Sequence, residues 1–142
     1  HTALQVVKDY PQKHYHSLGI PTWLYGHEPT NPFASHIAKL FENSVREDIL
    51  LTIAYGGIIY SPGSAGTLQE IFQDALQNQY NTLGVNSPMV FLNKEYWTKK
   101  VPIYNTLERL QELGTYNKLQ LTLTDNFMEA SQVIIDFAKN NK

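Results

Sequence analysis

One segment carries the residue types best suited to chemistry, because it joins an apolar stretch to an amphipathic one through two glycines. It runs Ser61-Pro62-Gly63-Ser64-Ala65-Gly66-Thr67. Glycine lets the main chain come close to a ligand, and the small side chains between the glycines leave the main-chain amides uncovered. A helix that begins here would aim its first amides and the positive end of its dipole at one point. Such a loop suits a phosphate group.

The same residues also fit a purely structural motif. In a capping box, Thr67 accepts a hydrogen bond from the amide three residues on, and Glu70 reaches back to the amide of Thr67. A glycine-rich turn does not by itself distinguish this cap from a phosphate-binding loop. Both interpretations therefore stay open on local grounds.

Residues 62–67 together with Glu70 resemble the Pro-Gly-Gly-x-Gly-Thr-x-x-Glu motif of the LOG (lonely guy) proteins, once described as possible lysine decarboxylases. Arg46 lies 16 residues before Pro62, close to the place where that family carries an arginine on the preceding helix. The resemblance extends over about residues 20 to 138. Residues 89–93 followed by 95–97 are similar to the family's next strand and its aromatic continuation, and residues 121–125 to its last strand.

The resemblance implies a Rossmann-like fold and, as in the family's enzymes, hydrolysis of the N-glycosidic bond of a nucleoside 5′-monophosphate to a free base and ribose 5-phosphate. It makes Arg46 and Glu70 the catalytic pair, with no metal and no cofactor. A carboxylate can stabilise the positive charge that develops on the ribose or orient water, and an arginine can hold the phosphate or keep the carboxylate ionised. The residues implied to bind the phosphate or ribose are Gly63, Ser64, Ala65, Gly66 and Thr67.

Three departures from the family pattern bear on this interpretation. Ser64 stands in place of the second glycine of the motif, and Glu47 follows Arg46 where the family usually has lysine. Both favour the alternative, a protein that binds a nucleotide or another phosphorylated cofactor without cleaving it. The strand, glycine loop and helix that open the family do not precede residue 20, so we expect the N-terminal part of the fold to be missing.

Other polar residues fit ordinary roles. Arg46 is spaced to pair with Glu42 one helical turn earlier, which gives it a structural alternative. His14 and His16 have no third ligand nearby and are not expected to hold a metal. A polar, proline-rich loop follows the first predicted strand and contains His27, Glu28 and Asn31. These side chains can contact a base, but the ordinary polarity of a loop explains them equally well. Trp97, Tyr96 and Tyr104 are expected to cover the sheet or a subunit contact.

The elements that position these residues follow from the apolar pattern. Four short apolar runs end at turn signals and are predicted as strands: residues 22–25, 57–60, 89–92 and 119–124. The second and third are apolar on consecutive residues, which is typical of strands covered on both faces of a parallel sheet. The alternation with helices predicts right-handed βαβ units in a single Rossmann-like α/β domain, residues 1–142, with about four parallel strands and helices on both faces.

Helices are predicted over residues 33–54, 67–80 and 103–113, with a final helix that Asp125 would cap. In the second of these, the apolar stripe is Leu68, Ile71, Phe72, Ala75, Leu76 and Tyr80, and the opposite side is Gln69, Gln73, Asp74 and Gln77. Residues 1–20 are predicted as a short helix and a connection.

Composition restricts the remaining function classes. The 142 residues are 42% hydrophobic, enough for one core, and 11 basic against 13 acidic residues give a net charge of −2, which argues against nucleic-acid and membrane partners. With no cysteine, disulfides, cysteine–zinc sites and thiol nucleophiles are excluded. The mean hydropathy is −0.33 and no apolar run is long enough for a membrane span, so we expect a cytoplasmic protein. Its expected partners are a nucleoside monophosphate or similar small molecule and a second copy of the chain.

Overall fold

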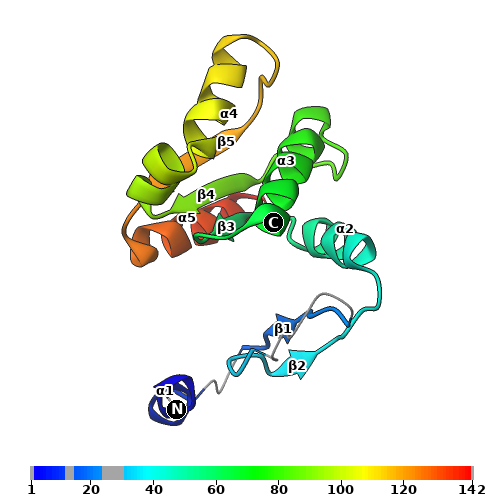
Figure 1. Ribbon diagram of the computed structural model, residues 1–142, viewed down its shortest axis with the longest axis vertical. Helices are drawn as coiled ribbons and strands as arrows, with labels where there is room; N and C mark the ends of the chain where they lie inside the picture. Colours follow the sequence, from blue (N-terminus) through cyan, green and yellow to red (C-terminus); the bar gives the residue numbers. More distant parts are fainter. Residues whose placement is uncertain (1, 12–14, 24–30, 142) are drawn as a thin grey trace. The chain divides into compact units, whose positions relative to one another are not determined.

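The computed structural model describes residues 2–11, 15–23 and 31–141. They belong to two compact units, His1–Leu50 and Leu51–Lys142, each described here by itself (Figure 1). The expectation of one domain over residues 1–142 stays a prediction. None of the helices in the described ranges combines the length and apolar character that a membrane crossing requires.

The first unit contains helix α1 (Thr2–Asp9) and a short parallel pair, β1 (Leu18–Gly19) and β2 (His36–Ile37). The predicted short N-terminal helix is therefore confirmed, whereas β1 and β2 were not predicted. Of the strand expected at residues 22–25, Thr22 makes a single parallel bridge with Leu40, and residues 24 and 25 lie outside the described part.

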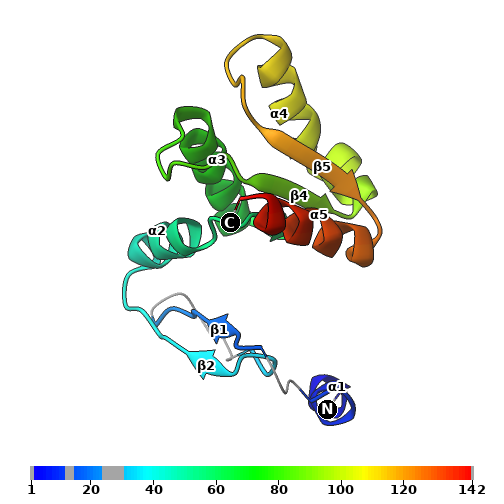
Figure 2. The same ribbon diagram turned by 180° about the vertical axis from the view of Figure 1, so that it is seen from behind.

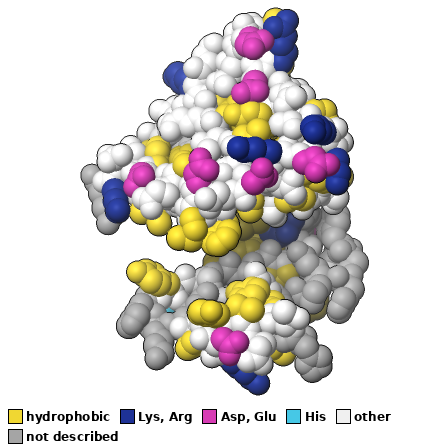
Figure 3. Space-filling model, turned by 90° about the vertical axis from the view of Figure 1, so that its left-hand side faces the viewer, with side chains coloured by type: hydrophobic (Ala, Val, Ile, Leu, Met, Phe, Trp, Pro, Cys, Tyr) yellow, Lys and Arg dark blue, Asp and Glu magenta, His cyan; other side chains and the backbone are white. Residues whose placement is uncertain are grey.

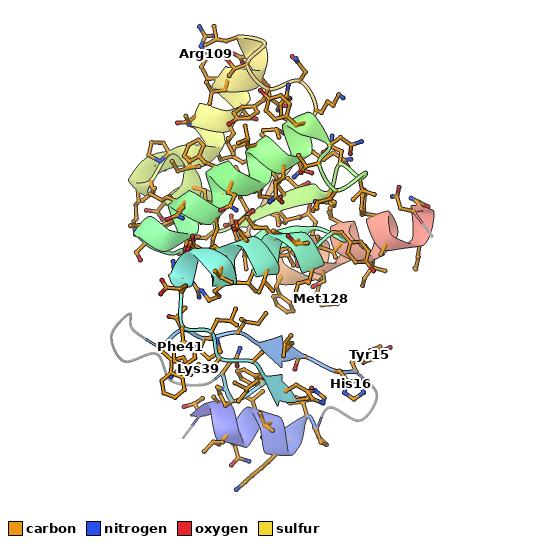
Figure 4. All side chains as sticks on the ribbon, turned by 90° about the vertical axis from the view of Figure 1, so that its right-hand side faces the viewer. Tyr15, His16, Lys39, Phe41, Arg109 and Met128 are labelled. Atoms are coloured by element: carbon orange, nitrogen blue, oxygen red, sulfur yellow. The ribbon has the colours of Figure 1, made fainter. Side chains whose placement is uncertain are left out.

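The helix predicted over residues 33–54 is wrong in its first half, because α2 spans Asn43–Ile53. Ile37 lies in β2, and both Ile37 and Phe41 are exposed, so their helical spacing does not mark a buried face. Phe41 instead stacks on Trp23 with 5.6 Å between ring centroids. Lys39, labelled with Phe41 in Figure 4, places its ammonium 4.4 Å from the centroid of the Trp23 ring.

The second unit is built on a parallel sheet with the order β3–β4–β5, formed by β3 (Ile58–Tyr60), β4 (Pro88–Leu92) and β5 (Gln120–Thr124). In this register Phe91 lies opposite both Tyr60 and Leu123. These strands match three of the predicted runs. The α/β class with a parallel sheet is confirmed.

Four helical segments accompany the sheet: α3 (Ala65–Tyr80), the π-helix η1 (Tyr96–Lys100), α4 (Ile103–Glu112) and α5 (Phe127–Asn140). Figures 1 and 2 show α4 and α5 on opposite faces of the sheet. Helices therefore cover both faces, as predicted. Gly114, which follows α4, has φ of +74°, a conformation that glycine adopts without strain and that suits the end of a helix.

The core lies between one face of the sheet and the helices α3, η1 and α4. It is a cluster of buried side chains from these elements and the segments between them: Tyr60, Ile71, Ala75, Met89, Phe91, Trp97, Leu107 and Leu119. Val90 points to the other face, where α5 packs, and is also fully buried. The prediction of a strand covered on both faces is thus confirmed for β4. It is wrong for β3, an edge strand of this sheet among the described residues, where Ile59 is 41% exposed.

Two details of the helices differ from expectation. In α3, Ile71 and Ala75 are buried and Leu68 packs partly buried against the core. Three other members of the predicted stripe, Phe72, Leu76 and Tyr80, are exposed, and Asp74, expected on the solvent side, is buried. The final helix is capped by Asn126, whose side chain accepts a hydrogen bond from the Met128 amide at 2.9 Å. Asp125 instead accepts a hydrogen bond from the main-chain amide of Lys94 at 2.8 Å, which joins the ends of β4 and β5.

Candidate functional site

The glycine-containing loop joins the end of β3 to the start of α3, at the edge of the sheet where the carboxyl ends of the strands lie. Ser64 is the N-cap of α3, with φ −114° and ψ −155°, and its side chain makes no capping hydrogen bond to the described chain. Thr67 is already the third residue of the helix, so the predicted capping box of Thr67 and Glu70 is wrong. The amides of residues 65–67 belong to the first turn, which has no intrahelical acceptor for them.

The two glycines of the loop, Gly63 and Gly66, lie in different surroundings. Neither has a positive φ, so backbone conformation does not require glycine at either position. A Cβ atom on Gly63 would lie 2.1 Å from Oγ1 of Thr67, so the close approach of Thr67 requires glycine there. A Cβ atom on Gly66 would meet no described heavy atom within 4 Å. The first turn of α3 therefore has open space beside Gly66.

The π-helix η1 holds this loop in place. The hydroxyl of Tyr96 donates a hydrogen bond to the carbonyl of Gly63. Nε1 of the buried Trp97 donates to the carbonyls of Tyr60 at 3.2 Å and of Leu92 at 3.0 Å, the last residues of β3 and β4. Trp97 and Tyr104 both pack edge-on against Phe91, so these aromatic side chains cover the sheet, as predicted.

A hollow of about 430 Å³ opens beside this loop. Its lining residues lie at or just after the ends of all three strands of the second unit: Pro62, Leu92, Asn93, Glu95, Asp125 and Phe127. In open parallel sheets, ligands bind in the crevice beyond the carboxyl ends of the strands. The loop, the start of α3 and the hollow thus lie where that rule places a ligand.

A chain of buried polar groups runs beneath the loop. The hydroxyl of Tyr60 donates to Oδ2 of Asp74 at 2.6 Å, Nδ2 of Asn78 donates to Oδ1 of Asp74 at 3.0 Å, and Oδ1 of Asn78 accepts the Ser87 amide at 2.7 Å. Burial raises the pKa of Asp74 to about 6, against the lowering effect of the hydrogen bond from Tyr60. Burial, with the negative charges of Asp74 and Glu70, raises the pKa of Tyr60 well above its usual value.

The predicted catalytic residues lie in different units. Arg46 is on α2 in the first unit, where its guanidinium Nη2 is 4.0 Å from Oε1 of Glu47. Glu47 is fully buried and accepts a hydrogen bond from Nδ2 of Asn43. Glu70 is on α3 in the second unit, and its charge acts on Tyr60. The pairing of Arg46 with Glu70 therefore stays a prediction.

Histidines and surface charge add no further site. Among the described residues, no group of three or more histidine and carboxylate side chains is placed to hold a metal ion. The ring of His16 lies 5.1 Å from that of His36, while His14, His27 and Glu28 lie outside the described residues. On the face of the second unit seen in Figure 3, acidic and basic side chains are interspersed. That face therefore does not have the continuous positive charge that nucleic-acid binding uses.

Two comparisons with known proteins complete the description. A family model described as possible lysine decarboxylase matches residues 5–136, which includes the loop, Arg46 and Glu70. No curated protein matches the chain significantly.

Proposed function

The chain belongs to the family described as possible lysine decarboxylase, which is the family of the LOG proteins, and from this premise we propose that it hydrolyses the N-glycosidic bond of a nucleoside 5′-monophosphate. The observation that carries the proposal is the start of α3 at the end of the glycine-containing loop, where the N-cap residue Ser64 makes no side-chain capping hydrogen bond to the described residues and a Cβ atom on Gly66 would meet open space. Bare amides at the positive end of a helix favour an anion. A phosphate ester supplies that anion, whereas the ammonium group of a lysine side chain does not.

The proposed reaction uses the loop to hold the phosphate and Glu70 to assist bond cleavage. Glu70 lies one helical turn beyond Thr67, about 5 Å further along the axis of α3. As the bond between C1′ and the base nitrogen breaks, its electron pair leaves with the base, and positive charge develops on the ribose. The carboxylate stabilises this charge and orients the water whose oxygen bonds to C1′, while a proton from that water ends on the base. In this scheme Arg46 binds the phosphate or keeps Glu70 ionised.

Two observations favour a second candidate, a protein that binds the nucleotide without cleaving it. The carboxylate of Glu47 lies 4.0 Å from the guanidinium of Arg46 and competes with a phosphate for it. Ser64 adds a hydroxymethyl group at the cap of α3, where the family motif has glycine. This candidate predicts that a monophosphate at 100 times its Kd raises the free energy of unfolding by about 2.7 kcal/mol with no turnover.

The proposal is tested by incubating the chain with AMP and measuring free adenine and ribose 5-phosphate by chromatography. Glu70→Gln is expected to abolish base release, with the unfolding curve unchanged. The matched control is Glu108→Gln on α4, an exposed glutamate outside the loop and the hollow, which is expected to retain the wild-type rate. Base release that persists in Glu70→Gln would remove Glu70 from the reaction, and ligand stabilisation without any base release would favour the second candidate.

The expected second copy of the chain remains part of the proposal. On α3, the apolar side chains of Phe72, Leu76 and Tyr80 are exposed at successive helical turns. β3 also leaves one strand edge unpaired by the described residues, with Ile59 partly exposed. An exposed apolar stripe and an open strand edge both favour association.

A further inference from the structure

A buried carboxyl group lies one helical turn beyond Glu70. Asp74 is 4% exposed and follows Glu70 by four residues on α3, so the two carboxyl groups lie along the same side of the helix. Burying an ionisable carboxyl group costs free energy unless hydrogen bonds compensate for lost hydration. Asp74 is not part of the family motif, and the proposed reaction does not use it.

The hydrogen bonds of Asp74 and of its partner Asn78 connect three parts of the second unit. Its Oδ2 accepts from the hydroxyl of Tyr60, the last residue of β3, and its Oδ1 accepts from Asn78 on its own helix. Asn78 in turn accepts the amide of Ser87, next to the start of β4. The bond from Tyr60 is the only one of the three that ties α3 to the residue directly before the loop.

We propose that Asp74 is a positioning residue, which through the hydroxyl of Tyr60 fixes α3 against the end of β3 and so sets where the loop and Glu70 lie. Two hydrogen bonds then hold the loop region, one that Tyr60 donates to Asp74 beneath it and one that Tyr96 donates to Gly63. The effect of Asp74 on catalysis by Glu70 rests on the proposed function, whereas its effect on the position of the loop does not.

The chemistry of Tyr60 and Asp74 suits a positioning hydrogen bond. With its pKa raised well above the usual value, Tyr60 stays protonated and remains a donor throughout the physiological pH range. The charged and titratable groups that act on this hydroxyl are Asp74 and Glu70, both from α3. An asparagine at position 74 keeps one oxygen, which can accept from Tyr60, and gives up the acceptor for Asn78, whereas alanine removes both acceptors. Comparing Asp74→Asn with Asp74→Ala therefore separates the loss of the negative charge from the loss of the oxygen that accepts from Tyr60.

The test is amide hydrogen exchange of the full chain, followed by mass spectrometry of the segment 61–68. Asp74→Ala and Tyr60→Phe are each expected to speed exchange in this segment about tenfold, since each removes a hydrogen bond to a charged group. Asp74→Asn is expected to stay within about threefold of wild type. The double variant Tyr60→Phe with Asp74→Ala should be no faster than either single variant, because both remove the same bond.

Asn78→Ala is the matched control, because it breaks the same polar chain on the side of Asp74 away from the loop. It is expected to speed exchange in residues 78–88 and to leave 61–68 near the wild-type rate. Unchanged exchange of 61–68 in both Asp74→Ala and Tyr60→Phe would overturn the proposal. The proposal would also be overturned if Asn78→Ala sped exchange of 61–68 as much as Asp74→Ala does, or if Asp74→Asn sped it as much as Asp74→Ala.

A second readout connects the inference to catalysis. With AMP as substrate, Asp74→Ala and Tyr60→Phe are expected to lower kcat about tenfold, and Asp74→Asn to restore it. If the wild-type chain released no base, the proposed function would be wrong, and hydrogen exchange of 61–68 would still decide whether Asp74 positions the loop. Normal kcat in Asp74→Ala together with faster loop exchange would restrict that role to the loop and overturn its extension to Glu70.

Discussion

The hydroxyl of Tyr96 donates a hydrogen bond to the main-chain carbonyl of Gly63, which joins η1 to the loop before α3. The next residue, Trp97, bonds to the carbonyls that end β3 and β4. One short π-helix therefore fixes three points of main chain around the candidate site. Single-turn π-helices are frequent at functional sites.

Tyr96→Phe removes this hydroxyl and keeps the ring. We expect the free energy of unfolding to fall by about 1 kcal/mol, the usual net contribution of one hydrogen bond, and the stabilisation by AMP to decrease because the loop is less ordered. Urea denaturation with and without AMP measures both. Tyr104→Phe is the control, because Tyr104 packs edge-on against the ring of Phe91 as Tyr96 packs edge-on against the ring of Trp97. Equal AMP stabilisation of the two variants would contradict a role for Tyr96 in holding the loop.

The two glycines of the loop should respond oppositely to alanine. Gly63→Ala places Cβ against Thr67, so we expect a loss of about 1–3 kcal/mol in the free energy of unfolding. Gly66→Ala meets open space and should leave stability unchanged or raise it by up to about 1 kcal/mol. It should nevertheless weaken AMP binding about tenfold, because the new methyl group lies where the phosphate approaches the amides. Calorimetric titration decides this, and wild-type affinity in Gly66→Ala would place the phosphate elsewhere.

Asp74 should make stability depend on pH in weak acid. Its pKa rises from 3.8 to about 6 on folding, so the folded chain holds its proton to higher pH than the unfolded chain. Between about pH 4 and 6 unfolding releases this proton, and the free energy of unfolding falls as pH rises, by about 3 kcal/mol over the window.

Asp74→Asn should abolish this loss, whereas the exposed Asp136→Asn on α5 should preserve it. Urea denaturation at intervals from pH 4 to 7 measures the difference between each variant and wild type. Parallel curves for wild type and Asp74→Asn would show that Asp74 titrates normally.

Arg46 is tested by comparing a nucleotide with its nucleoside. If it holds the phosphate, Arg46→Ala should weaken AMP binding about 10- to 100-fold and leave adenosine binding unchanged. Glu47→Gln, which removes the neighbouring negative charge, should strengthen AMP binding. Arg109→Ala is the control, because Arg109 lies at the exposed end of α4, paired with Glu112 at 2.7 Å (Figure 4). Equal AMP affinity of the two arginine variants would count against Arg46 as a phosphate ligand.

The exposed stripe of α3 predicts the oligomeric state. We expect the chain to sediment as a dimer at micromolar concentration and Leu76→Glu, at a side chain that is 50% exposed, to shift it to monomer. Leu113→Glu makes the same change at an exposed leucine after α4 and should leave the dimer intact. Sedimentation velocity measures all three. A monomeric wild type, or a dimeric Leu76→Glu chain, would exclude this interface.

The second unit was largely predictable from sequence because its signals are local. A continuous apolar run that ends at a turn signal located β4, which is covered on both faces, and Gly114 marked the end of α4. The loop with Gly63 and Gly66 was found by residue type and spacing alone, at the junction of β3 and α3.

What sequence could not reveal depends on contacts between distant residues. The burial of Asp74 depends on a hydroxyl from β3, so helical periodicity placed this residue on the wrong side. Asp125 and Asn126 are equally good N-caps by type, and only the bond from the Lys94 amide explains why Asp125 is not used. In the first unit, β1 and β2 are too short for an alternating pattern to develop.

Each unit of this chain contains one of its two tryptophans, in contrasting surroundings. Trp23 is 53% exposed and stacked on Phe41, whereas Trp97 is fully buried and bonded to the strand ends beside the loop. Intrinsic fluorescence therefore has two emitters that separate by wavelength, a red-shifted one for the first unit and a blue-shifted one for the second. Replacing Trp23 with phenylalanine leaves a single optical probe beside the loop, so that occupancy of the site can be followed without any added label.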